Sequence, residues 1–322
     1  MKRESSIYTV VSIVATVLFL LSTSFILGWD SSQTLFQRLG DNVALSSVVS
    51  ILAFAFISFL LSYVNLRCFS YSPRSILLYG TYLIMILVIP GSLIFSQYHI
   101  AAMLVIWAIM YMFKFVVYEK LKYSHLFQAI LCVSTASVLV PELLLYLLLF
   151  VFFSFGRREY NGLRIFYTIA GALVLPWVYL FSISFLFEGP SAGEIVEMYC
   201  ASLSNVSPSI SSLTISGVVY YSALLLIILR AMLYFRSLYA QRNRAQRVSI
   251  NFSLALSVAS LVLIGFYFNP NNFMLAIPLF VSFTFSIFDY FKNGRKGEAR
   301  LAFTLLCVMA VMYRVSLLLE VL

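Results

Sequence analysis

Long apolar segments recur along the whole chain, and they decide the solvent in which it folds. A helix of about 20 apolar residues crosses the hydrocarbon core of a bilayer, which is about 30 Å thick. The segments leave no room for a separate soluble domain, so we predict one integral membrane domain over residues 1–322, an all-α polytopic transmembrane bundle. They cover residues 7–27, 44–64, 75–95, 101–118, 126–155, 164–187, 213–235, 249–268, 273–290 and 301–319.

The composition agrees with a lipid solvent. Hydrophobic residues make up 62% of the chain and charged residues 10%, whereas soluble domains average about 45–50% and about 25%. A soluble enzyme, a disordered chain and a disulfide-rich secreted module are therefore excluded. The cysteines are isolated, without CxxC or Cys/His spacing, so the sequence predicts no metal site built from them.

Basic residues outnumber acidic ones, with 21 Lys+Arg against 12 Asp+Glu. No basic run is interleaved with aromatic residues in a soluble domain, so we expect no nucleic-acid partner. Lys and Arg are retained in the cytoplasmic loops of inner-membrane proteins, and the excess therefore indicates the topology of a bacterial inner-membrane protein. Lys2 and Arg3 place the N-terminus in the cytoplasm, and the apolar segment after them is too long for a cleaved signal.

The fifth segment, residues 126–155, determines the topology, because it can form one long tilted helix or a hairpin of two short ones. A single crossing would put the arginines that follow it outside the cytoplasm. A reversal at Val140-Pro141-Glu142 keeps both ends inside and leaves only Arg38 and Arg314 away from the cytoplasmic side. Pro141 also favours the reversal, because proline lacks the N–H that a helix interior requires.

The hairpin gives about eleven apolar helices, with the N-terminus in the cytoplasm and the C-terminus in the periplasm. Each half of the hairpin has about 14 residues and a length of about 21 Å, which is less than the hydrocarbon thickness of about 30 Å. Its tip should therefore end below the outer surface, where non-helical backbone needs protein or water around it.

The first outward loop, residues 28–43, gathers two carboxylates and a basic residue. Asp30 or Asp41 has the chemistry of a general base or of a ligand for a divalent cation, and Arg38 has that of a phosphate contact. The alternative is a solvated loop in which Trp29 lies in the interfacial aromatic belt and Asp41 caps the next helix.

Glu142 at the hairpin tip is the second candidate, because an ionisable group inside the bilayer requires a partner or water. Its candidate partners are Arg38, His99 and Arg314, in a site that binds the counter-ion of an anionic headgroup or carries out proton chemistry. Alternatively, Glu142 is the N-terminal charge of the helix that follows it. We expect His99 to be a surface residue on a tight outward turn, and Arg314 to extend to the outer surface or to pair with Glu320.

Two further surfaces have the character of a membrane or partner contact. In the longest outward loop, residues 192–203 have a weak amphipathic pattern that fits a lid over a lateral opening or a simple surface helix. The inward basic residues between 230 and 300 carry enough charge to attract anionic lipid, at about 1 kcal/mol per residue, or serve only as topology determinants.

The middle of the chain resembles that of the GT-C membrane glycosyltransferases in layout. A basic inward turn precedes the hairpin, a second basic turn follows it, and the next helix contains a Gly-x-x-x-x-Pro pattern. The resemblance covers roughly residues 1–190, the GT-C-like portion, and further helices follow over 213–322. The residues that carry it are Tyr118-Glu119-Lys120-Leu121-Lys122-Tyr123, Pro141-Glu142, Gly156-Arg157-Arg158 and Gly171-Ala172-Leu173-Val174-Leu175-Pro176.

This resemblance implies an enzyme that uses a polyprenyl-phosphate sugar from the outer leaflet, with an acidic residue of the first outward loop as base or metal ligand. By position, that residue would be Asp30 or Asp41, and a divalent cation would be the cofactor. The chain also resembles a family of multi-pass inner-membrane proteins from Bacteroidota, which share the hairpin and the Gly-x-x-x-x-Pro helix and have no established activity.

The sequence leaves three functions open. The first is a GT-C-like transferase in cell-envelope biogenesis that uses a lipid-linked sugar at the outer face, with Asp30 or Asp41 as base and Arg38 and Glu142 shaping the phosphate and cation environment. The second is a non-catalytic membrane subunit or scaffold that docks a membrane-protein partner in an envelope complex. The third is a secondary transporter, which the small number of ionisable residues in the apolar segments disfavours.

The predicted topology can be tested by labelling. A cysteine introduced at Gly156, in a variant without the native cysteines, should react with a membrane-impermeant maleimide only after the cells are permeabilised, because the hairpin keeps this position in the cytoplasm. A cysteine at Ser31 in the first outward loop is the matched control and should react in intact cells. Reaction of position 156 in intact cells would overturn the hairpin.

Overall fold

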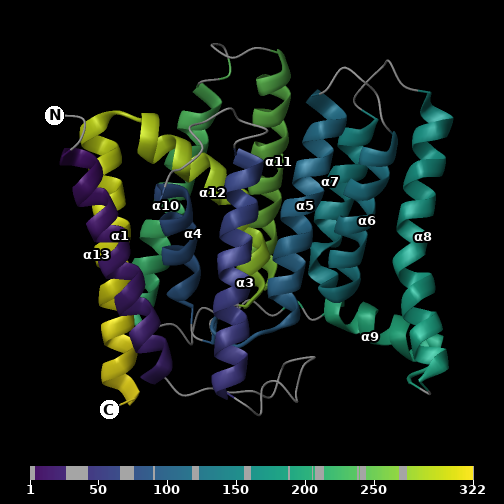
Figure 1. The fold of residues 1–322 in the computed structure, drawn as a ribbon, viewed down its shortest axis with the longest axis horizontal. Coiled ribbons are helices and arrows are strands. Elements are labelled where there is room, and N and C mark those ends of the chain that lie inside the picture. The colour runs from purple at the N-terminus through teal and green to yellow at the C-terminus, as the bar shows by residue number, and fades with distance from the viewer. Residues whose placement is uncertain are drawn as a thin grey trace.

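The computed structural model consists of helices joined by turns (Figure 1). No strand occurs in the residues that it describes, so the all-α class predicted from the sequence is confirmed for them. The described residues are 4–26, 43–65, 76–89, 91–117, 123–155, 161–187, 189–204, 206, 214–237, 239, 244–267 and 274–321.

The helices largely coincide with the apolar segments, as expected where lipid offers no partner to backbone N–H and C=O groups. One turn of 3₁₀ helix, η2 (Pro141–Leu143), separates two of them. The α-helices are α1 (Glu4–Ile26), α3 (Val43–Val64), α4 (Ile76–Leu87), α5 (Gln97–Val117), α6 (Tyr123–Leu139), α7 (Leu144–Ser154), α8 (Gly162–Leu186), α9 (Ala192–Ser204), α10 (Ile215–Ser237), α11 (Arg244–Tyr267), α12 (Ala276–Asn293) and α13 (Lys296–Val321).

Among the described residues, six helices are long and apolar enough to cross a membrane. They are compatible with a polytopic membrane protein. The finer count of about eleven crossings stays a prediction, because several of the remaining apolar helices are shorter than 18 residues. The candidate spans are Leu45–Val64, Gln97–Val116, Gly162–Leu186, Ile215–Ser237, Arg247–Tyr267 and Gly297–Leu319.

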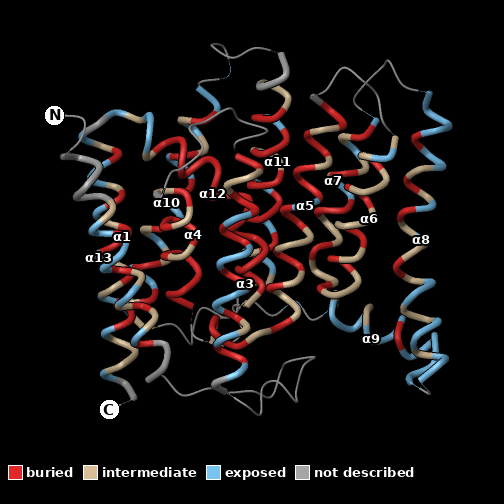
Figure 2. The backbone as a smooth tube through the Cα atoms, in the orientation of Figure 1, coloured by how far each residue is buried: buried red, intermediate tan, exposed pale blue. Residues whose placement is uncertain are grey.

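Protein surrounds α12 at the centre of the bundle (Figure 2). Every residue from Ala276 to Tyr290 is buried, and α4, α5, α10, α11 and α13 pack around the helix. A mostly apolar helix buried on every side occupies such a position. Its hydroxyl groups are satisfied internally, since Ser282, Thr284 and Ser286 donate to carbonyl oxygens about one turn earlier at 2.8 to 2.9 Å. The core along α12 is therefore filled with side chains.

The hairpin reverses where the sequence predicted. α6 ends at Leu139, η2 forms a single turn, and α7 runs back along α6 (Figure 1). Val140 has extended backbone angles, φ −135° and ψ 90°, because the ring of a following proline disfavours the helical conformation. The Leu143 N–H donates to the Val140 carbonyl at 3.0 Å and closes the turn. We call the end of the bundle at η2 the tip face; it is at the bottom of Figure 1.

A second break at the tip face interrupts the apolar segment predicted over residues 75–95. α4 ends at Leu87, and mostly buried turns lead to the start of α5. The sequence Ile89-Pro90-Gly91 explains the break, because a proline disfavours helix in the residue before it and Gly91 has a φ of 74° that glycine adopts without strain. The Phe95 N–H donates to Ser46 Oγ of α3 at 3.0 Å. Protein surrounds most of this non-helical backbone, as non-helical backbone inside a membrane requires.

α8 stands at one end of the row of helices in Figure 1 and packs mainly against α6. Most of its remaining surface is apolar and exposed, as in a helix that faces lipid; Phe185 and Leu186 are 85% and 72% exposed. The short helix α9 lies across the tip face, between the end of α8 and the hairpin (Figure 1). The fold thus brings α8, α9, the hairpin tip and the start of α5 together.

Candidate functional site

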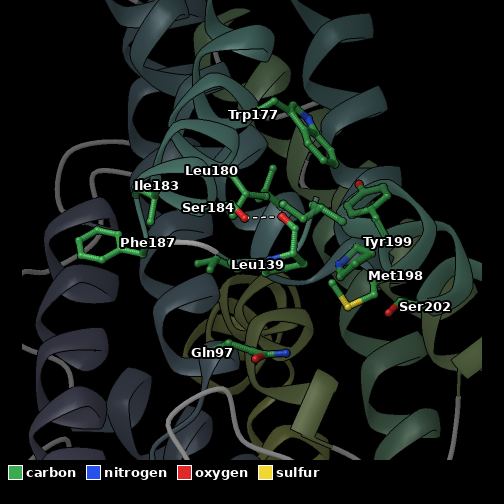
Figure 3. Close-up of a pocket in the computed structure, with 15 residues that line it drawn as sticks. Gln97, Leu139, Trp177, Leu180, Ile183, Ser184, Phe187, Met198, Tyr199 and Ser202 are labelled. Atoms are coloured by element: carbon green, nitrogen blue, oxygen red, sulfur yellow. Dashed lines mark hydrogen bonds between the residues drawn. The ribbon is translucent and has the colours of Figure 1, made fainter. Parts of the chain in front are cut away.

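A cavity of about 490 Å³ opens at the tip face between α8, α9, the hairpin tip and the start of α5 (Figure 3). Sites for small molecules usually measure about 300–1,000 Å³ and combine apolar walls with a few polar groups. Here the polar groups are those of Gln97, Ser184 and Ser202. The apolar wall includes Val138, Leu139, Pro141, Trp177, Leu180, Ile183, Met198 and Tyr199.

The connection from α8 to α9 fixes where α9 begins. Ser191 and Glu194 form a capping box, in which the Glu194 N–H donates to Ser191 Oγ at 3.3 Å and the Ser191 N–H donates to the Glu194 carboxylate at 2.9 Å. The pair satisfies two donors that the start of a helix leaves unbonded. The Gly189 N–H donates to the Ser184 carbonyl at 2.8 Å, and Ser184 Oγ donates to the Pro190 carbonyl. A Cβ at Gly189 would lie 2.9 Å from Ser184 Oγ, so this close approach favours glycine.

Contacts farther along α9 hold it against the bundle. The rings of Trp177 and Tyr199 meet edge to face, with centroids 5.0 Å apart, a geometry that stabilises by about 0.5–1.5 kcal/mol beyond area burial. The Tyr267 hydroxyl of α11 donates to the Leu203 carbonyl at 2.9 Å, near the helix end, where carbonyl groups lack helical partners. Ile195 is buried beneath the helix. α9 is therefore a fixed wall of the cavity.

Glu142 lies at the hairpin tip, next to the cavity wall at Pro141, and is half-buried. Its carboxyl group interacts electrostatically with the phenols of Tyr98, Tyr199 and Tyr267. These tyrosines belong to α5, α9 and α11, so three separate helices contribute to the surroundings of one carboxylate.

The described surroundings of Glu142 include phenols and no paired cation. Burial raises the pKa of Tyr199, a hydrogen bond with Ser137 lowers it, and the negative charge of Glu142 raises it further. Within the described residues, no Lys or Arg forms an ion pair with Glu142. The described residues therefore supply no cationic partner of the kind that the sequence led us to expect for Glu142.

His99 is fully buried, so its expected position on the surface is wrong. Its Nδ1 accepts from the Ser96 N–H at 3.3 Å, and Nε2–H therefore faces the Ser92 carbonyl at 3.1 Å and Ser50 Oγ at 3.0 Å. The expectation failed because α5 begins at Gln97 rather than at residue 101. His99 consequently lies in the first turn of a packed helix and holds the break between α4 and α5.

Arg314 is also buried, with 1% of its surface exposed, and the expected extension to the outer surface is wrong. Its Nη2 donates to the Leu87 carbonyl at 2.6 Å, where α4 ends and a positive charge is favoured beside unbonded carbonyl groups. The phenols of Tyr220, Tyr221 and Tyr313 interact with the guanidinium. α13 stands at the opposite end of the row from α8, which lines the cavity (Figure 1), so Arg314 belongs to a different place from the cavity.

The candidates of the first outward loop, Asp30, Arg38 and Asp41, lie outside the described residues. Of the other predicted site residues, the structure places only Glu142 beside the cavity. In the ranges that it describes, no three His, Cys, Asp or Glu side chains come together as a candidate metal site.

The sequence did not predict the cavity, although one signal locates its wall. The pattern Ser191-x-x-Glu194 is that of a capping box and marks the start of α9. Of the predicted amphipathic face, Tyr199 and Leu203 are partly buried, whereas Val196 is exposed. No motif marks the contribution of Trp177, which looks like an ordinary residue of an apolar helix.

No family model, no curated protein and no solved structure matches this chain. The resemblance to GT-C enzymes and to the Bacteroidota family therefore stays a prediction. The geometry of the cavity and the charges around it are the basis for assigning a function.

Removing the capping box should loosen α9 without unfolding the bundle. A cap is worth about 1 kcal/mol, so Ser191→Ala should speed amide hydrogen exchange in the first turns of α9 by about fivefold. Glu197→Gln is the matched control on the exposed face of the same helix and should leave exchange unchanged. Equal exchange in S191A and the unaltered protein, measured by mass spectrometry in detergent, would show that the cap does not hold α9.

Proposed function

We propose that this polytopic membrane protein binds the hydrocarbon chain of a lipid in the tip-face cavity, at the outer side of the bacterial inner membrane, and acts in cell-envelope biogenesis. One observation carries the proposal: an apolar cavity opens at the edge of the bundle, beside a carboxylate at the end of a short hairpin. Gln97, Ser184 and Ser202 supply the few polar groups that orient a ligand in such a site.

The position of α9 supports a lipid ligand. With Ile195 buried and Glu197 exposed, α9 has the character of a helix that lies in the membrane interface. The cavity beneath it is then level with the lipid chains of the outer leaflet. Because the cavity lies between α8 and α9, a chain enters from the lipid side without crossing the packed core around α12.

A transfer reaction at the outer face is the chemistry that would use such a site. In the GT-C-like interpretation, Asp30 or Asp41 serves as base or holds a divalent cation, and Arg38 contacts the phosphate of a polyprenyl-linked sugar. The support for this interpretation is the apolar cavity next to Glu142.

A non-catalytic membrane subunit is the second candidate, and the surface of α8 favours it. This helix leaves large apolar side chains exposed along most of its length, among them Phe166, Val178 and Phe185, and a partner helix can cover them as lipid does. Secondary transport has the least support, because α12 is enclosed by packed side chains where a transporter needs a polar path.

Blocking the cavity tests the lipid site. Leu180→Trp fills part of it, and excluding two methylene groups of a chain costs about 1.6 kcal/mol, or roughly tenfold in affinity. Photo-crosslinking to a phospholipid with a diazirine in its chain, in nanodiscs, should fall accordingly at Met198 and Tyr199. Leu226→Trp on the exposed face of α10 is the control and should change nothing. Undiminished labelling in L180W, with thermal stability intact, would overturn the site.

The transferase interpretation has a separate test in cells. Asp30→Ala and Asp41→Ala, made singly in the native host, should alter the envelope glycan profile if either residue is the base or cation ligand, because loss of such a group typically lowers a rate by about 10²–10⁴-fold. Asn42→Ala in the same loop is the control. An unchanged profile in both Asp variants, at normal protein levels, removes the transferase and leaves the lipid-binding subunit.

A further inference from the structure

The charged residues that the described elements place near the cavity are acidic. α9 carries Glu194 and Glu197 and no Lys or Arg, and the hairpin adds Glu142. The basic residues of the neighbouring helices are far along the chain from this end: Lys114 is in the last turn of α5 and Arg164 is in the first turn of α8. The described elements at the mouth of the cavity therefore present carboxylates without a compensating cation. A headgroup with net negative charge is repelled there, and an ammonium group is attracted.

Glu142 is the carboxylate that such a headgroup meets. It is half-buried beside Pro141, and within the described residues it has no basic partner. Glu194, by contrast, is used by the backbone N–H of Ser191. A carboxylate at the level of the membrane interface is costly when it is unpaired, so a ligand that brings a positive charge gains the most at Glu142.

The phenols beside Glu142 suit the same ligand. Tyr98, Tyr199 and Tyr267 offer ring faces, which attract cations, and hydroxyl oxygens, which accept hydrogen bonds. The Tyr267 hydroxyl already donates to the Leu203 carbonyl, so its oxygen is available as an acceptor. Tyr199 both lines the cavity and interacts with Glu142, and it therefore connects the place of a lipid chain to the place of its headgroup.

We infer that the lipid bound in the tip-face cavity carries a primary ammonium headgroup, as phosphatidylethanolamine does, with its chain against Trp177 and Tyr199 and its ammonium at Glu142. A primary ammonium donates three hydrogen bonds to carboxylate and phenol oxygens, whereas a trimethylated ammonium donates none. This inference rests on the proposed lipid site and specifies its ligand. It assigns the cavity to an amine-bearing lipid and leaves a polyprenyl phosphate to the first outward loop, where Arg38 lies in the sequence.

The test compares headgroups on one and the same lipid chain. The full-length protein is placed in vesicles of phosphatidylcholine that contain equal small amounts of a diazirine-tailed phosphatidylethanolamine, phosphatidylcholine or phosphatidylglycerol, and crosslinks are mapped by mass spectrometry. A hydrogen-bonded ion pair is worth roughly tenfold in affinity, so the ethanolamine lipid should label Met198 and Tyr199 about tenfold more than either of the others.

Three variants distinguish the effect of the Glu142 charge from the effect of its side-chain size. Glu142→Gln keeps the size of the side chain and should bring ethanolamine labelling down to the level of the choline lipid. Glu142→Asp keeps the charge and should retain the preference. Glu298→Gln removes a carboxylate that pairs with Arg230 away from the cavity, and should behave as the unaltered protein.

The outcomes distinguish this inference from the proposed function. Labelling of the cavity by all three lipids to the same extent, or an unchanged ethanolamine preference in E142Q, would overturn the headgroup assignment and keep the lipid site. Equal labelling by the ethanolamine and choline lipids above the glycerol lipid would also overturn it, because the charge alone would then be recognised. Absence of any label at Met198 and Tyr199 would overturn the lipid site itself.

Discussion

The need to satisfy every backbone N–H and C=O group inside the protein governs this structure. Helices satisfy these groups along their length. Backbone groups without helical partners therefore occur at the two breaks at the tip face. At the hairpin, a 3₁₀ turn closes on the Val140 carbonyl. At the end of α4, Arg314 takes the Leu87 carbonyl, and His99 holds the turn through Ser92 and Ser96. Arg314 and His99, which the sequence suggested as site residues, therefore hydrogen-bond to backbone groups in this structure.

Glu142 lies in the first turn of η2, where its carboxylate accepts from its own backbone N–H, as the helix-start alternative in the sequence analysis expects. Its other described neighbours are phenols, and no cation of the described residues pairs with it. The cavity beside it is bounded by α9, whose capping box and ring contacts give it a fixed position. A rigid apolar wall next to an acidic residue is the basis of the proposal that a lipid binds here with its ammonium group at Glu142.

The packed centre limits which functions fit. α12 is buried along Ala276 to Tyr290 and separates the cavity from the opposite end of the bundle. The described cavity accordingly lies at the edge and the tip face of the bundle and not along α12. The proposed transferase and the proposed lipid-binding subunit both use this cavity. They differ in whether Asp30 or Asp41 of the first outward loop takes part in a reaction.

The sequence by itself determined that the chain folds as apolar helices compatible with a membrane and that it reverses at Pro141, because hydrophobicity and a missing N–H act locally. It also singled out Glu142, since a charge in an apolar segment is visible without a fold. It misplaced His99 and Arg314, whose burial depends on neighbours from other helices. Only the tertiary structure decided the cavity, because Gln97, Trp177, Tyr199 and the hairpin tip are distant in sequence and meet through helix packing alone.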